Sequence, residues 1–239
     1  MAEVGFGTGY LNHKLKLPLK EVIVLYSDTA DAIEINFGSY NELINFELNR
    51  ETAKMLRKFS YVSIHAPSKE IVYGNTHETK LAFEKIKYLS GKIKIKGIVI
   101  HPSSVEDFSI FNEFNLPFLV ENMDKMQEKF TNPQHFSELR ENYNFGFVLD
   151  LQHAYEHDSS MKLCKELIEI MGNRLKELHV SGMNTKLHHA LVHCSDNKEA
   201  ISSILKLKLN IPIILEGAFS EPLRENMKKE LDYVRSFYS

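Results

Sequence analysis

Six short apolar runs in the chain each end in a side chain that can bind a metal ion. The runs are YVSIH, GIVIH, PFLVE, GFVLD, LKELH and PIILE, ending at His65, His101, Glu121, Asp150, His179 and Glu216. Neutral imidazole and carboxylate oxygen are ligands for Zn²⁺, Mn²⁺ and Fe²⁺. A polar residue at the end of a buried run is costly unless something binds it. The pattern therefore predicts a centre for divalent metal ions, built from distant parts of the chain.

The apolar runs themselves are typical of strands that are buried on both faces. Strands are expected at 3–7, 32–36, 61–65, 97–101, 117–121, 145–150, 175–180 and 211–216. Amphipathic helical stretches alternate with them near 19–27, 49–58, 77–90, 104–114, 134–142, 160–171, 196–206 and 222–236. Units of about thirty residues have the size of a strand–helix–strand repeat.

This alternation predicts an α/β protein, a single (β/α)8 TIM barrel that occupies residues 1–239 as one domain. The chain of 239 residues is close to the roughly 250 typical of that fold. Strand ends meet at one rim of such a barrel, where the active site lies. An open doubly wound sheet is the alternative, but it usually carries a Gly-x-Gly-x-x-Gly turn, and GFGTGY near the start lacks that spacing.

Further candidate ligands lie outside the six runs. Asp150 and His153 are three residues apart in LDLQHAY, so both can face the rim if a turn follows the strand. The stretch HVSGMNTKLHHALVHC adds His188, His189 and His193 in a loop, where each could equally be a surface histidine. Glu34 ends the second strand and fits a substrate contact, a partner of a metal ligand, or a plain buried carboxylate.

Composition excludes several classes of protein. Hydrophobic residues make up 43% of the chain, enough for a full core, and a net charge of −3 does not by itself indicate nucleic-acid binding. Two cysteines are too few for a disulfide framework and fit a reducing compartment. With no signal-peptide pattern and no long apolar run, we expect a cytoplasmic protein that does not associate with a membrane. The GxSxG, P-loop and HExxH motifs are missing from the sequence.

The segments SIHAP, VIHP, LVEN, LDLQHA, the stretch from His179 to His189, and ILEGA together resemble the xylose-isomerase-like barrel superfamily. The resemblance is closest to the endonuclease IV family of metal-dependent abasic-site endonucleases. It implies a first zinc ion on His65 and His101, and Glu121 as a bridge to a second. Asp150, His179 and Glu216 would hold that second ion, and His153 with His188 a third. The chain departs from the family at Lys186, where the family has an aspartate, because a lysine repels a divalent cation.

The resemblance implies a phosphodiester hydrolase that cleaves DNA at abasic sites by a metal-bound hydroxide. Two or three divalent ions are expected, zinc first and Mn²⁺ or Fe²⁺ as alternatives. Glu121 and Glu216 would be catalytic, and Glu34 and Lys186 would contact the substrate.

Two other functions remain open from the sequence. A sugar isomerase or epimerase of the same superfamily would act on a sugar or phosphorylated sugar. It would hold one ion with Glu121, Asp150, His179 and Glu216, and its two glutamates would transfer protons. A barrel that binds a ligand or partner without catalysis is the third hypothesis.

Overall fold

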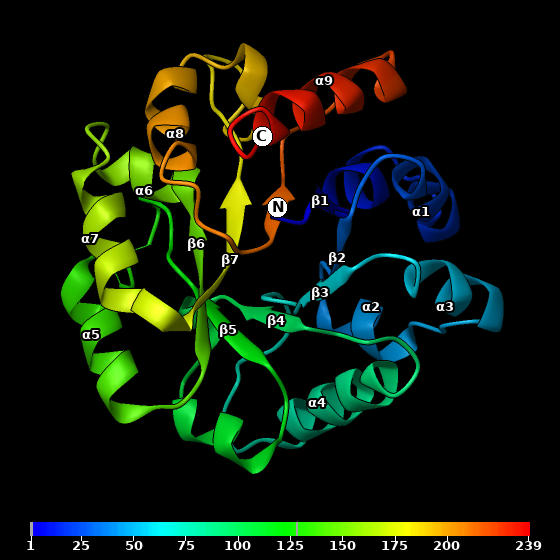
Figure 1. Ribbon diagram of the computed structural model, residues 1–239. Helices are drawn as coiled ribbons and strands as arrows, with labels where there is room; N and C mark the ends of the chain where they lie inside the picture. The colour runs from blue at the N-terminus through cyan, green and yellow to red at the C-terminus, as the bar shows by residue number, and fades with distance from the viewer. Residues whose placement is uncertain (1, 128) are drawn as a thin grey trace.

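The structure, a computed structural model, describes residues 2–127 and 129–239, in which eight parallel strands close into one barrel in sequence order. The strands are β1 (Val4–Gly7), β2 (Ala32–Asn36), β3 (Tyr61–His65), β4 (Gly97–Ile100), β5 (Phe118–Glu121), β6 (Gly146–Asp150), β7 (Leu175–Val180) and β8 (Ile213–Leu215). Each lies within its predicted range. The strands gather in the centre with the helices around them (Figure 1), which confirms the predicted (β/α)8 TIM barrel.

The helices between the strands follow most of the predicted amphipathic stretches. They are α1 (Leu19–Ser27), α2 (Tyr40–Asn45), α3 (Arg50–Leu56), α4 (His77–Ser90), α5 (Pro133–Asn142), α6 (Leu151–His157), α7 (Lys162–Met171), α8 (Lys198–Leu205) and α9 (Leu223–Arg235). One π-helical turn, Tyr10–Lys14, follows β1. Within the described residues, none of the helices combines the length and the apolar character needed to cross a bilayer.

The prediction of an α-helix over 104–114 is wrong. Two 3₁₀ turns, Pro102–Ser104 and Phe108–Glu113, occupy this segment. A 3₁₀ turn has three residues per turn, so it places the aromatic residues at positions 108 and 111 on one face. That face packs on the barrel, with the ring centroid of Phe111 4.6 Å from that of Phe118 in β5. The 3₁₀ spacing thus accompanies aromatic packing against the barrel wall.

Alternate residues of each strand face opposite sides of the barrel wall. Outward-facing side chains such as Ile33, Ile64 and Val120 join the large apolar core beneath the helices. The inward-facing apolar side chains form only small clusters, one of Ala32, Tyr61 and Ile214 and another of Val99, Leu119 and Val148. Polar side chains fill much of the remaining interior, and they position the functional site.

Barrel closure beside β1 depends on a glycine. Gly5 pairs with Ala32 of β2, and a Cβ at Gly5 would lie 1.7 Å from the carbonyl oxygen of Ala32. Because that oxygen belongs to the backbone, Gly5→Ala should force β1 and β2 apart and destabilise the protein by about 3 kcal/mol or more. Urea unfolding measures this loss. Gly74→Ala is the control, since its Cβ would meet no atom nearer than 3.7 Å; equal stability of the two variants would contradict the prediction.

Candidate metal centre

Six strands supply a compact group of imidazole and carboxylate side chains at one end of the barrel interior. They are His65 (end of β3), His101 (after β4), Glu121 (end of β5), Asp150 (end of β6), His179 (in β7) and Glu216 (after β8). Each lies at an inward-facing position; His101, for example, follows the inward-facing Val99 by two residues. The structure therefore brings together all six residues that end the apolar runs.

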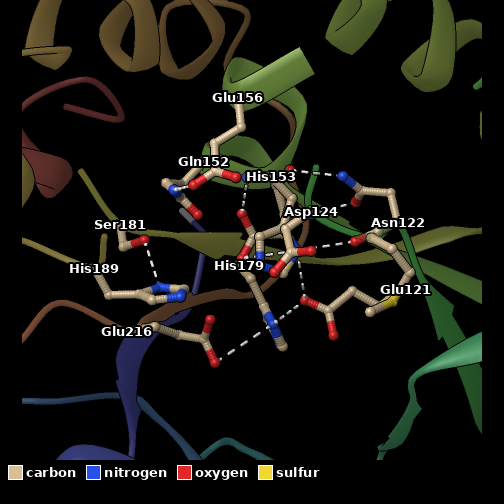
Figure 2. Close-up of polar contacts among 12 residues, drawn as sticks. Glu121, Asn122, Asp124, Gln152, His153, Glu156, His179, Ser181, His189 and Glu216 are labelled. Atoms are coloured by element: carbon tan, nitrogen blue, oxygen red, sulfur yellow. Dashed lines mark hydrogen bonds and ion pairs between the residues drawn. The ribbon is translucent and has the colours of Figure 1, made fainter. Parts of the chain in front are cut away.

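Glu121 lies in the middle of this group. Its Oε2 atom is 3.2 Å from Nε2 of His101 and 3.4 Å from Nε2 of His65. Its Oε1 atom is 3.1 Å from Nδ1 of His179. Figure 2 shows the carboxylates of Glu121 and Glu216 approaching the His179 ring, the latter with Oε1 3.6 Å from Nδ1. The two oxygens of Glu121 thus face different sets of histidines.

Three groups of potential metal ligands lie in the described part of the barrel, and two of them share Glu121; the third is Glu34, Glu177 and His179, deeper in the interior. Of the two that share Glu121, one is His65, His101 and Glu121, and the other is Glu121, Asp150, His179 and Glu216. Within each group one donor atom per residue lies within 4.8 Å of the others. The mixture of imidazole and carboxylate suits Zn²⁺, Mn²⁺ or Fe²⁺. The arrangement can hold two ions with a carboxylate between them.

Two carboxylate oxygens in the group are buried and, among the described residues, lack a hydrogen-bond partner. They are Oε2 of Glu121 and Oδ2 of Asp150. Buried carboxylate oxygens are normally paired, because leaving one unpaired costs free energy. A bound cation would satisfy both atoms, so the donor set fits a divalent metal ion.

Asp150 also caps a helix, and this contact fixes the orientation of its side chain. Its Oδ1 atom accepts a hydrogen bond from the backbone N–H of His153 at 2.8 Å, so it caps the start of α6. Asn122 holds the backbone of Asp150 on both sides, donating to its carbonyl and accepting from its N–H. These contacts leave Oδ2 free to face the centre. They also explain why a helix begins at Leu151, where the sequence predicted only a turn.

The charges in the group favour cation binding. Burial opposes ionisation of Glu121, but the charge of His179 and the close imidazoles keep the pKa of Glu121 well below its usual range. Burial lowers the pKa of His101, which keeps this ring neutral. Burial also opposes protonation of His65, yet Glu121 and Glu34 raise the pKa of His65 to about 9. Burial raises the pKa of Glu216 to about 8. A bound cation would take the place of the protons that these raised pKa values leave on His65 and Glu216.

The residues expected for a third ion are only partly together. Nδ1 of His153 lies 2.9 Å from the carbonyl oxygen of Asn122, 3.8 Å from Glu121 Oε1 and 3.9 Å from Asp150 Oδ2. His153 is therefore beside the centre but outside both ligand groups. His189 approaches it with the ring centroids 5.9 Å apart, and Nδ1 of His189 is 3.0 Å from Oγ of Ser181.

His188, the histidine predicted for the third ion, faces the other way. Its side chain is 72% exposed, and its Nδ1 lies 3.2 Å from Oε1 of Glu156. Gly182 pairs with Ala190 across the loop, and His189, next to Ala190, has its ring toward Ser181 and His153. The sequence alone carries no signal for that pairing. The role of His188 at a third ion therefore stays a prediction, and the structure places its ring outside the two groups that share Glu121.

Replacing His188 by Ala should leave metal content unchanged and alter the free energy of unfolding by less than about 0.5 kcal/mol, as for other exposed side chains. Elemental analysis of the purified protein and urea unfolding measure the two quantities. His189→Ala, the inward-facing neighbour, serves as the comparison. A loss of metal in the His188 variant alone would show that this loop adopts another arrangement when metal is bound.

The two residues predicted to contact the substrate lie in different surroundings. Glu34 is fully buried in the barrel interior, with Oε2 3.3 Å from Nε2 of His179, so it has no surface to offer a substrate and is a partner of a candidate ligand instead. Lys186 is exposed on the loop after β7. Sequence reasoning missed Glu177, whose Oε1 lies 2.9 Å from Nε2 of His179. The alternation of LKELH could have revealed it, since Glu177 and His179 must share a face.

The loop after β7 is anchored on the outside of the barrel by Glu230 of α9. This buried carboxylate accepts hydrogen bonds from the backbone N–H groups of Val192 at 2.6 Å and His193 at 3.1 Å. Nδ1 of His193 lies 2.6 Å from the same carboxylate. His193 is therefore a structural contact and faces away from the candidate centre.

A cleft of about 280 Å³ opens beside the centre. Glu216 and His189 form one wall of it, and Tyr10, His13 and Lys14 of the π-helical turn form another. The cleft gives a substrate access to the carboxylate of Glu216.

Comparisons with known proteins extend this description at the level of the fold. No protein-family model and no curated protein sequence matches the chain. Endonuclease IV from Thermus thermophilus is similar in structure, with 17% identity, a TM-score of 0.69, and coverage of 99% of this chain and 98% of that one. A probable 3-DHS dehydratase from Bacillus anthracis has 12% identity, a TM-score of 0.72, and 98% coverage of both chains. The 3-keto-D-glucoside 4-epimerase from E. coli has 12% identity, a TM-score of 0.67, and coverage of 99% and 100%.

These neighbours carry different activities on one architecture. The similar structures also include a xylose isomerase domain protein and a xylose isomerase-like TIM barrel fusion protein. From its closed barrel and its similarity to these structures over almost its whole length, the chain shares their (β/α)8 TIM-barrel fold.

Proposed function

We propose that the protein is a metal-dependent phosphodiester hydrolase that cleaves DNA at abasic sites. The observation that carries the proposal is the position of Glu121, whose two oxygens face two separate groups of ligands. A shared carboxylate of this kind is suited to a pair of ions. Two ions about 3.5–4 Å apart stabilise the attacking and leaving oxygens of a phosphoryl displacement.

The candidate ligands divide into two groups, one for each proposed ion. His65, His101 and Glu121 would hold one ion. Asp150, His179 and Glu216, again with Glu121, would hold the other. Divalent ions there, zinc first, would lower the pKa of water and neutralise charge on a phosphate. Glu216 borders the cleft, so it would also face the bound substrate.

The choice of substrate is supported by the neighbour whose name states a DNA activity, endonuclease IV. The histidine pair adds to this support, because His65 and His101 complete a second ligand group that a single-ion sugar site does not require. Lys186, on the loop after β7, and Lys14, at the end of the π-helical turn after β1, are exposed cations. Either could contact a phosphate of the DNA backbone.

The test is incubation of the purified protein, loaded with Zn²⁺ or Mn²⁺, with a DNA duplex that carries one abasic site. We expect a single nick at that site, loss of nicking after chelation, and its return when metal is restored. A duplex of the same sequence without the abasic site should stay intact. Nicking no greater than in the chelated sample would remove this proposal.

The second candidate function is a sugar isomerase or epimerase. Glu121, Asp150, His179 and Glu216 form a ligand group that is complete for one ion, and several similar structures are named as epimerases. In this reaction Glu121 and Glu216 would move protons on either side of a bound ketose. One tightly bound ion per chain, with interconversion of ketoses and no nicking, would favour this function over hydrolysis.

A further inference from the structure

The barrel interior beneath the metal centre holds a second set of buried polar side chains. Glu34 of β2, Ser63 of β3 and Glu177 of β7 are fully buried. Oγ of Ser63 lies 3.3 Å from Oε2 of Glu34 and 3.4 Å from Oε1 of Glu177. Other inward-facing positions, such as Val99 and Val148, are apolar. Because apolar residues often stabilise a core more than buried charges do, folding alone does not account for these carboxylates.

Glu177 contacts the centre through one of its candidate ligands. It precedes His179 by two residues in β7, so the two side chains share the inner face. Nε2 of His179 is 2.9 Å from Oε1 of Glu177, and Nδ1 is 3.1 Å from Oε1 of Glu121. The two ring nitrogens therefore face in opposite directions, one toward the metal ligands and the other toward Glu177.

Glu34 also reaches the ring, but it is less suited to orient it. Its Oε2 atom is 3.3 Å from Nε2 of His179 and accepts from Ser63, while its Oε1 atom accepts from Nδ2 of Asn36 at 3.0 Å. The contact of Glu177 with the ring is shorter and has hydrogen-bond geometry. Glu177 is thus the principal partner of the nitrogen that faces away from the centre.

We propose that Glu177 is a positioning residue that makes His179 a metal ligand through Nδ1. The Glu177 carboxylate accepts the Nε2–H bond of His179, which fixes the ring orientation and keeps the lone pair of Nδ1 available to the ion shared with Glu121, Asp150 and Glu216. A carboxylate in this position also makes an imidazole a stronger ligand. The inference rests on the metal centre of the proposed function, and it requires neither the hydrolytic reaction nor the DNA substrate.

The test compares zinc affinities of Glu177→Leu and Glu177→Gln, each made in a His65→Ala/His101→Ala background that keeps only the ion at Asp150, His179 and Glu216. Competition with a chromophoric chelator measures the affinity. We expect the Leu variant to bind zinc about 10–100-fold more weakly. The Gln variant keeps an acceptor for Nε2–H and should recover most of the affinity. Ser63→Ala is the matched control, since Ser63 contacts Glu177 but has no contact with His179 among the described residues.

A second measurement reports the proton position directly. Long-range ¹H–¹⁵N spectra of zinc-loaded protein should show His179 protonated at Nε2 in the parent and in the Gln variant, with the resonance assigned by its loss in His179→Gln. This readout remains decisive if the Leu variant does not fold. Coordination of zinc through Nε2 would overturn the proposal.

Three further results would overturn it. The first is an unchanged zinc affinity in a folded Leu variant. The second is equal weakening by Ser63→Ala, which would indicate a general structural effect. The third is loss of an additional ion held by Glu34, Glu177 and His179, since Glu177 would then be a ligand itself. A protein that shows the expected affinities but leaves abasic DNA intact would contradict only the proposed reaction.

Discussion

Glu121→Gln is expected to remove most of the bound metal and to lower DNA nicking by at least about 10³-fold. Glu121 belongs to both proposed ion sites, so its loss should affect both ions, whereas His65, His101, Asp150 and Glu216 each belong to one group. The ions are expected to supply several kcal/mol of transition-state stabilisation, and each 1.36 kcal/mol corresponds to a factor of ten in rate. Elemental analysis and the nicking assay measure the two effects.

The control for this variant is Glu166→Gln, the same change at an exposed position of α7. It should keep both metal content and activity. Glutamine has nearly the volume of glutamate and removes a buried charge, so the metal-free Glu121 variant should still fold. A Glu121→Gln protein that retains two ions would show that this carboxylate does not bridge them.

The double variant His65→Ala/His101→Ala should hold one ion instead of about two and lose about 10³-fold or more of its nicking activity. Within the other group, the nitrogen atoms of these two rings approach only Glu121, and the His65 ring also stacks on His179 with centroids 6.0 Å apart. Neither change removes a donor atom of that group, so it should keep its ion. The variant also separates the two candidate functions, because a single-ion isomerase should still interconvert ketoses after this change.

The matched comparison is Asp150→Asn, which alters the other ligand group and should leave the ion on His65 and His101 in place. Metal counts on both variants, made from protein purified without chelator, complete the assignment. If the double variant nicks abasic DNA at the parent rate, the two-ion proposal is excluded.

The fold and the grouping of the main candidate ligands follow from the sequence because both depend on strand alternation. In GIVIH, for example, Val99 faces inward, so His101 two residues later must also face inward. Repeating this argument for each apolar run predicts the ring of ligands without knowledge of any helix. The same argument should have included Glu177, which lies earlier on the same face as His179.

Loops were less predictable, because their side chains are oriented by contacts between distant segments. His188 and His189 are adjacent in sequence, but the contacts that separate them, a bridge from Gly182 to Ala190 and the approach of His189 to Ser181, join residues whose proximity the sequence pattern does not indicate. The segment 104–114 has an amphipathic pattern, but it forms a 3₁₀ turn over Phe108–Glu113 whose Phe111 packs on Phe118 of β5. The sequence also carried no sign that Asp150 caps α6. The cap uses Oδ1 and leaves Oδ2 without a hydrogen-bond partner among the described residues, so Oδ2 is available to a metal ion.

Glu230 connects the last helix, α9, to the loop after β7, although α9 lies away from the candidate metal ligands. Glu230 accepts hydrogen bonds from the backbone N–H groups of Val192 and His193, and so fixes the end of the loop that carries His189. The last helix of the barrel therefore stabilises the loop beside the candidate site. Proteolysis of α9, or a charge-reversing substitution at Glu230, would first increase the mobility of the loop that carries His189. Loss of the overall fold would follow only with greater damage.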